Sequence, residues 1–141
     1  MTKYCTDSSY GTVDNKTTLE AEDDVAHVKW GGSWRMPTKT EWEELINNCT
    51  WEWTTQSDVN GYKVTSKQTG YTDKSIFLPV TGYYSDSGLD FTGRCYYWSS
   101  SLYTKSRSAS DVICYNAFYD NINTNANQRY SGIAVRPVLA E

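Results

Sequence analysis

The sequence has few of the residues on which metal sites depend. It contains one histidine, His27, and four cysteines, and no two of the cysteines form a CxxC pair. Structural zinc sites need closely spaced Cys and His ligands, so this spacing predicts no metal site. The acidic stretch 86–90 lacks the spacing of an EF-hand loop, and we expect it to form a turn around Gly88.

Catalytic motifs are missing as well. The chain has no GxSxG elbow, no phosphate-binding glycine loop and no HExxH motif. The hydroxyls of residues 99–101 have no base near them in the sequence, and His27 is expected to be structural. Glu41, Glu43 and Glu44 are expected on a solvated helix face, not as an acid and a base. We therefore expect no catalytic residues, no cofactor and no enzymatic activity.

Long apolar runs and clustered basic residues are also missing. No apolar run approaches the roughly 18 residues of a membrane span, and the first residues lack the apolar stretch of a signal peptide. The net charge is −4, and the Lys and Arg residues are dispersed along the chain. Nucleic-acid binding needs them clustered on one element. We expect neither membrane insertion nor nucleic-acid binding.

Aromatic residues, in contrast, are abundant. The 141 residues include 6 Trp and 12 Tyr, and such a content is typical of a folded chain. The length fits a single domain, 1–141, which could be the C-terminal part of a longer protein. Four cysteines allow two disulfides in any of three pairings, but a domain of this size does not require them. Buried or half-buried thiols are therefore expected at Cys5, Cys49, Cys95 and Cys114.

Two helices are expected in the first half of the chain. Segment 22–30 begins with acidic residues and is followed by Gly31-Gly32, which suits the two ends of a helix. Thr38 and Glu41 have the spacing of a capping box at the start of a second helix. Apolar residues follow at helical spacing and predict one buried stripe, made of Trp42, Leu45, Ile46 and Cys49.

The rest of the sequence predicts short strands separated by turns. Residues 51–55 and 62–65 alternate, which predicts a hairpin with Asn60-Gly61 as its turn. The apolar stretch 76–80 predicts a buried strand, and Pro79 indicates a sheet edge or a bulge. These elements together predict a small α+β domain. Further strands are expected at 96–99, 112–115 and 133–138.

Residues 115–130 are unusually rich in Asn and Tyr, which account for eight of the sixteen positions. Asn disfavours helix interiors and strands, so this stretch is expected to be an ordered or semi-ordered loop. It could be a polar loop with no partner. It could also be a recognition surface, because Tyr offers broad contact area and Asn offers adaptable hydrogen bonds, as in antibody paratopes.

The sequence also resembles a known family. Residues 31–42, GGSWRMPTKTEW, are similar to the GG-x-W-R-[LM]-P-T-x-x-E-W signature of a family of domains in gut Bacteroidetes and their phages. Residues 76–83, 97–101, 129–132 and 135–138 match later blocks of the family in order. The resemblance implies a C-type lectin-like α+β fold, in the branch shared with formylglycine-generating enzymes. That fold has two helices, small antiparallel sheets and long ordered loops.

Within this family, the C-terminal part resembles the variable region of diversity-generating retroelement proteins. In those systems a reverse transcriptase copies a template repeat with replacement of adenines, and the copy overwrites the end of the gene. Asn codons then give Tyr, Ser, Asp, Ile or Thr. The resemblance implies a hypervariable binding surface within residues 97–135. The expected contact residues are Tyr103, Ser106, Arg107, Ser108, Ser110, Asp111, Cys114, Asn116, Tyr119, Asn121, Asn125, Asn127, Gln128 and Ser131.

The implied function is ligand binding by a fixed scaffold, on a phage tail-fibre tip or a bacterial surface. The partner would be a protein or glycan receptor on a cell surface. Trp98, Arg136 and Pro137 belong to the matching blocks and are expected to be structural, with Arg136 paired internally. The Glu-Pro-Asn and Gln-Pro-Asp loops of calcium-dependent lectins are missing, so calcium is not implied.

Two other functions remain open on the sequence. One is a structural or adhesive surface domain of a gut bacterium that shares the scaffold without diversification. The other is an enzyme of the formylglycine-generating type. That activity needs a reactive cysteine pair, and Cys95 and Cys114 do not map onto it.

Overall fold

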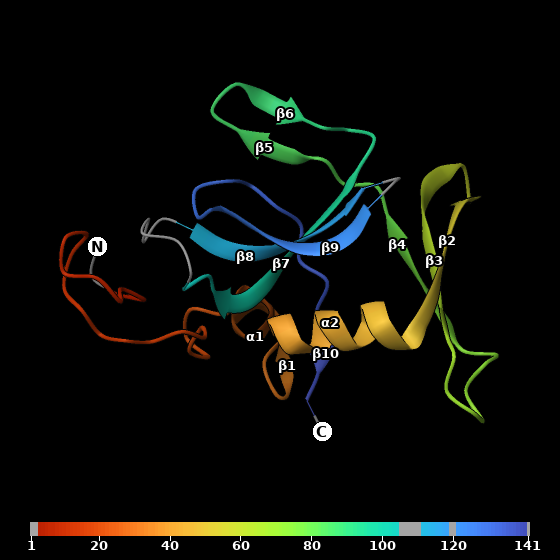
Figure 1. Ribbon diagram of the computed structural model, residues 1–141, viewed down its shortest axis with the longest axis horizontal. Coiled ribbons are helices and arrows are strands. Elements are labelled where there is room, and N and C mark those ends of the chain that lie inside the picture. Colours follow the sequence, from red (N-terminus) through yellow and green to blue (C-terminus); the bar gives the residue numbers. More distant parts are fainter. Residues whose placement is uncertain (1–2, 105–110, 119–120, 141) are drawn as a thin grey trace.

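The computed structural model describes residues 3–104, 111–118 and 121–140. Within them the chain forms two helices and ten strands (Figure 1). The helices are α1 (Val25–Trp30) and α2 (Lys39–Asn48). The strands are β1 (Trp34–Arg35), β2 (Cys49–Gln56), β3 (Val59–Ser66), β4 (Ser75–Pro79), β5 (Tyr83–Ser85), β6 (Gly88–Asp90), β7 (Cys95–Leu102), β8 (Asp111–Phe118), β9 (Asn121–Gln128) and β10 (Val138–Leu139).

The strands form four small sheets, and every strand pairing within them is antiparallel. Their orders are β1-β10, β2-β3-β4, β5-β6 and β7-β8-β9. Helix α2 runs along the β7-β8-β9 sheet and contacts all three of its strands (Figure 1). The β2-β3-β4 sheet stands beside one end of α2, and the β5-β6 hairpin lies on the other side of β7-β8-β9 from the helix (Figure 1). None of the described helices has the length and apolar character needed to cross a membrane.

Helix α2 begins with the capping box that the sequence predicts. The Thr38 hydroxyl accepts from the Glu41 amide, and the Glu41 carboxylate accepts from the Thr38 amide at 2.8 Å. The apolar stripe is also confirmed, since Trp42 is buried in the core and Leu45 and Ile46 pack against it. The expectation that Glu41 lies on a solvated helix face is wrong. Its carboxylate also accepts from the Arg35 guanidinium.

Helix α1 is shorter than expected. It starts at Val25 because Asp24 is the N-cap, and the Asp24 carboxylate accepts from the amides of Ala26 and His27. The other oxygen of Asp24 accepts from the Met36 amide at 2.8 Å, which ties the start of the helix to the residue after β1. The helix ends at Gly31, whose φ of 66° is a conformation that favours glycine.

The hairpin of β2 and β3 forms, but the prediction of its turn is wrong. The two connecting residues are Ser57 and Asp58, with φ angles of 51° and 65°, and Gln56 pairs with Val59. Positive φ at both positions is the geometry of a two-residue hairpin turn. Gly61 lies inside β3, where a Cβ atom would come within 2.4 Å of the Leu78 carbonyl oxygen.

Strand β4 confirms a strand close to the predicted 76–80, but the strand is only partly buried, since Ile76 is 37% exposed. Leu78 is fully buried, and among the described strands β4 pairs with β3 alone, so Pro79 lies on an edge strand. The predicted strand at 133–138 is mostly wrong, since only Val138 falls in a strand, the two-residue β10. Before it, Gly132 and Ala134 form isolated bridges, to Tyr84 of β5 and to Tyr97 of β7.

The Asn- and Tyr-rich stretch is not the expected loop. Residues 111–118 and 121–128 form β8 and β9, which pair over their full length from Asp111 with Gln128 to Phe118 with Asn121. The average preference of Asn for loops is overridden by strand pairing, since β8 pairs with β7 and β9 pairs with β8.

The expected α+β class is therefore wrong. The two helices contain only 6 and 10 residues, while strands make up much of the remaining chain, so the structure is mostly β. The long ordered loops expected in the C-terminal half are largely replaced by the β8-β9 hairpin. The small antiparallel sheets and the two helices are present, but a C-type lectin-like fold is not confirmed.

The main core lies between α2, the β2-β3-β4 sheet and β7. Tyr62 is its centre, with the rings of Trp51 and Trp53 edge-on at 5.6 and 5.0 Å. Trp42 of α2 packs on Tyr97 of β7, with 5.9 Å between ring centroids. Three of the four cysteines are free thiols as expected: Cys5 and Cys95 are buried and Cys49 is half-buried. The side chain of Cys114 lies outside the described part.

A second, smaller cluster covers the other side of β7. Tyr96 and Ile133 are buried there, with Tyr83 and Trp98 packed against them. The Tyr83 ring meets Tyr96 edge-on at 4.9 Å and stacks on Phe91 at 5.4 Å. Alternate residues of β7 therefore point into two different clusters, as the pleat of a strand requires.

Candidate ligand-binding face

The β7-β8-β9 sheet has two distinct faces. Cys95 and Tyr97 of β7 and Ile122 of β9 point toward the main core and α2. The opposite face carries Tyr96 and Trp98 of β7. Every second position of β8 and β9 is in register with these two residues and belongs to the same face. We call the β8 and β9 part of this side the asparagine face. Its positions are Val112, Cys114, Asn116 and Phe118 on β8 and Asn121, Asn123, Asn125 and Asn127 on β9.

The described side chains of the asparagine face are accessible and polar. Asn125 is exposed, and Asn123 and Asn127 are half-buried. The Nδ2 of Asn125 donates to Oδ1 of Asn123 at 3.1 Å, so the two amides are held in line along β9. Each amide still has donor and acceptor capacity to offer a ligand.

Several of the expected contact residues fall on this one face. They occupy positions Cys114 and Asn116 of β8 and Asn121, Asn125 and Asn127 of β9. Pairing brings Cys114 opposite Asn125 and Asn116 opposite Asn123. Positions on two successive strands thus form one continuous patch. Other expected contacts lie outside the described residues: Ser106, Arg107, Ser108, Ser110 and Tyr119.

The remaining expected contacts are placed differently. Asp111 and Gln128 pair with each other at positions belonging to the core-side face, at the end of the hairpin, where Gln128 is exposed. Tyr103 is half-buried just after β7. Ser131 is buried, and its hydroxyl donates to Oδ1 of Asn127 at 3.3 Å, so it holds a side chain of the face in place.

Sequence reasoning missed Asn123 as a site residue. The signal was present, because Asn occurs at every second position from Asn121 to Asn127. A period of two is the signature of a strand with one polar face. The period of two was missed because the stretch was expected to be a loop and not a strand.

Residues next to the hairpin tie it to the rest of the molecule. The Arg129 guanidinium donates to the carbonyls of Lys3 and Tyr4, at 3.4 and 2.6 Å, which holds the N-terminal segment beside the end of β9. Gly132 exchanges backbone hydrogen bonds with Tyr84 of β5, and a Cβ atom on Gly132 would come within 3.0 Å of the Tyr84 Cβ. This close approach explains why glycine stands there.

The residues expected to be structural are only partly so. Trp98 is half-buried, and its carbonyl accepts from Nε1 of Trp42 at 3.3 Å. Pro137 is half-buried, but Arg136 is exposed rather than enclosed in an internal pair. Arg35 forms the internal pair instead, with both guanidinium NH2 groups on the Glu41 carboxylate.

Buried groups beneath the face are held in their neutral forms. Burial raises the pKa of the Cys95 thiol to about 12, and its Sγ donates to the Leu78 carbonyl at 3.6 Å. Burial also raises the pKa of Tyr97, whose hydroxyl donates to the Pro79 carbonyl at 2.7 Å. A protonated thiol is a poor nucleophile, so Cys95 acts as a packing residue.

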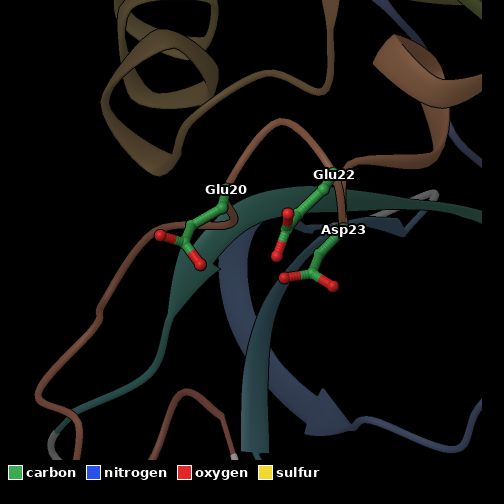
Figure 2. A group of neighbouring side chains, drawn as sticks. All are labelled: Glu20, Glu22 and Asp23. Atoms are coloured by element: carbon green, nitrogen blue, oxygen red, sulfur yellow. The ribbon is translucent and has the colours of Figure 1, made fainter.

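A separate cluster of three carboxylates lies on the loop before α1. Glu20, Glu22 and Asp23 place ligand oxygens within 4.8 Å of one another (Figure 2). Lys3 already supplies a cation, with Nζ at 2.5 Å from Glu22 and 2.7 Å from Asp23, and Lys16 lies 2.6 Å from Glu20. The hydrogen bond from Lys3 lowers the pKa of Asp23 and raises that of Lys3. The cluster fastens the N-terminal segment through these ion pairs.

An apolar cavity of about 250 Å³ lies between the N-terminal segment and β7. Its walls come from Thr17 to Leu19, from Met36, and from Trp98 to Ser100. Arg129 lines it as well, at the point where its guanidinium holds the N-terminal segment. The cavity is thus formed by the same contacts that attach that segment to the sheet.

No family model, curated protein or solved structure matches this chain. The asparagine face is accordingly interpreted from its own chemistry.

Proposed function

We propose that this chain is a non-catalytic ligand-binding domain whose asparagine face is a hypervariable surface diversified by a retroelement. Its ligand would be a protein or glycan receptor on a cell surface, and the domain would act on a phage virion or a bacterial surface. The observation that carries the proposal is the grouping of five expected contact positions on one face of the β8-β9 hairpin.

The arrangement suits substitution because the two faces of the hairpin have different tasks. On β9, Ile122 packs against the main core. On the other face of the same strand, Asn123 is half-buried and Asn125 is exposed. Alternate positions of a strand point to opposite faces, so the polar positions can change without disturbing the core.

The chemistry of the face suits varied partners. Asn amides both donate and accept hydrogen bonds, so they can match backbone groups of a protein or hydroxyls of a sugar. The exposed Tyr130 adds an aromatic surface beside Gln128, to which its hydroxyl donates. Aromatic and amide side chains together are the composition of adaptable binding surfaces.

The genomic test reads the DNA around the gene. Diversification predicts a near-copy of the sequence for residues 100–135, differing only at adenines, beside a reverse-transcriptase gene. If the locus has neither the near-copy nor the reverse-transcriptase gene, the proposal that the face is diversified is wrong. A fixed adhesive domain would then be the better interpretation.

The protein-level test randomises two matched sets of positions. The first set is Asn123, Asn125 and Asn127, and the control set is Ile122, Thr124 and Ala126 on the other side of the same strand. We expect the first library to stay folded and to yield binders against a panel of surface proteins and glycans. The control library should lose folded members. Equal losses in both libraries would contradict the proposal.

A further inference from the structure

Strand β9 is the outer strand of the β7-β8-β9 sheet, and within the described residues no strand pairs with its outer edge. An unpaired edge presents backbone N–H and C=O groups that can pair with another extended chain. The groups that are free on β9 follow from its register with β8.

Phe118 pairs with Asn121 across a two-residue connection, and such a closing pair is hydrogen-bonded in an antiparallel hairpin. Hydrogen-bonded and non-bonded pairs then alternate, so the odd-numbered residues of β9 bond to β8. The backbone groups of the even-numbered residues point outward.

Gln128 agrees with this assignment. Its amide donates to Oδ1 of Asn127 at 2.8 Å, and its carbonyl accepts from the Ser131 amide at 3.0 Å, so neither group serves the β8 ladder. These two bonds also close the edge at that end. The open edge therefore consists of Ile122, Thr124 and Ala126, a set symmetric about Thr124.

We propose that a second copy of this chain pairs antiparallel with β9, with the two-fold axis at Thr124. In this register Thr124 meets its own counterpart, and Ile122 meets Ala126 of the other copy on either side. Three donors and three acceptors on each copy are then all satisfied. A two-fold interface requires a self-complementary patch, and this set meets that requirement.

The side chains of β9 favour this partner. Residues 121–128 contain no Lys, Arg, Asp, Glu or Pro, so neither like charges nor a missing donor oppose pairing of two copies. The edges of the other three-stranded sheet carry such residues, with Glu52 exposed on β2 and Pro79 on β4. Charged residues and Pro on edge strands discourage pairing, and β9 lacks them.

Pairing would join the asparagine faces of the two copies. Asn123 would lie opposite Asn125 of the other copy, where amides can exchange hydrogen bonds. The joined face would be twice as wide across the strands and would bind multivalent receptors with avidity. The pairing itself does not depend on the proposed function, because it uses backbone groups and needs no ligand.

Sedimentation of the full chain over a range of micromolar concentrations tests the proposal. We expect the mass to rise from 16.1 kDa toward twice that value as concentration increases. Thr124→Pro removes one outward donor from each copy and no donor to β8. It should weaken dimerisation about 10- to 100-fold. Thr124→Val keeps the N–H and should dimerise like the original chain.

Hydrogen exchange on the unmodified chain gives a second readout, needed because Thr124→Pro could also disturb the hairpin. The amides of Ile122, Thr124 and Ala126 should exchange more slowly at high protein concentration, while those of Asn123 and Asn125 should not change. The proposal would be overturned if the mass stayed monomeric at every concentration. It would also be overturned if the exchange rates of the three amides did not depend on protein concentration.

Discussion

Glu41 binds Arg35 and caps helix α2 at the same time. Its two carboxylate oxygens accept from the Arg35 guanidinium at 2.7 and 2.6 Å, and one of them also accepts from the Thr38 amide. The hydrogen bonds from Arg35 lower the pKa of Glu41 to about 2. One carboxylate therefore links β1 to the start of the helix that supports the sheet.

This carboxylate predicts a pH dependence. The pKa of Glu41 is lower in the folded state than the ordinary value near 4.3, so its stabilisation is fully present above pH ~4.3 and is lost as the pH falls toward 2. Glu41→Gln should lower the free energy of unfolding at neutral pH by on the order of 1 kcal/mol, because the pair is partly exposed to solvent.

The measurement is chemical denaturation of both proteins from pH 2 to pH 7. Their difference in stability should shrink at the acidic end. Glu44→Gln, an exposed glutamate on the same helix, is the control and should show little difference at any pH. A constant difference for Glu41→Gln across the whole range would mean that the ion pair does not stabilise the fold.

Trp42→Ala should destabilise the protein by about 3–5 kcal/mol, because it removes a buried ring that packs on Tyr97 and donates to the Trp98 carbonyl. Trp30→Ala is the matched control, since Trp30 is 58% exposed and contacts only the edge of Trp34 among the described rings. It should cost about 1 kcal/mol or less. Denaturation curves of the two variants measure both losses of stability. Equal losses would show that Trp42 is not part of the core.

Asn125→Ala should change the free energy of unfolding by less than about 1 kcal/mol, because Asn125 is exposed and its recorded partner is another surface amide. Ile122→Ala, three positions earlier and facing the core, should cost about 2 kcal/mol or more. Thermal melts distinguish the two. Similar losses would show that the asparagine face is packed structure and not a displayed surface.

Gly61→Ala should cost about 1–3 kcal/mol, because the added methyl group would overlap backbone atoms of β4. Gly93→Ala is the control, since a Cβ atom there meets nothing within 4 Å. Calorimetry on both variants tests this. A neutral Gly61→Ala would mean that β4 shifts without cost.

Local signals in the sequence predicted local structure well. The capping box of Thr38 and Glu41 and the apolar stripe of α2 were predictable because each depends on residues within two turns of one helix. The edge position of Pro79 was predictable because proline cannot donate a ladder hydrogen bond.

Non-local pairing decided what the sequence alone did not predict. Asn60-Gly61 is a strong turn signal, but Gly61 is required inside β3 because β4 approaches too closely for any side chain. The residues of 115–130 were assigned by the average preference of Asn, whereas pairing of β8 with β7 and of β9 with β8 makes most of them strands. The asparagine face could therefore be assembled only once the register of β8 and β9 was known.

Strand β7 holds both the entry and the exit of the β8-β9 hairpin. Cys114 of β8 pairs with Trp98 on one side of β7, and Ala134, beyond the hairpin, bridges to Tyr97 on the other. The hairpin is therefore attached along a whole strand and through Ile122, which packs against the main core. A foreign hairpin grafted here would have to keep the pairing with β7 and an apolar residue at position 122, while its other face could differ.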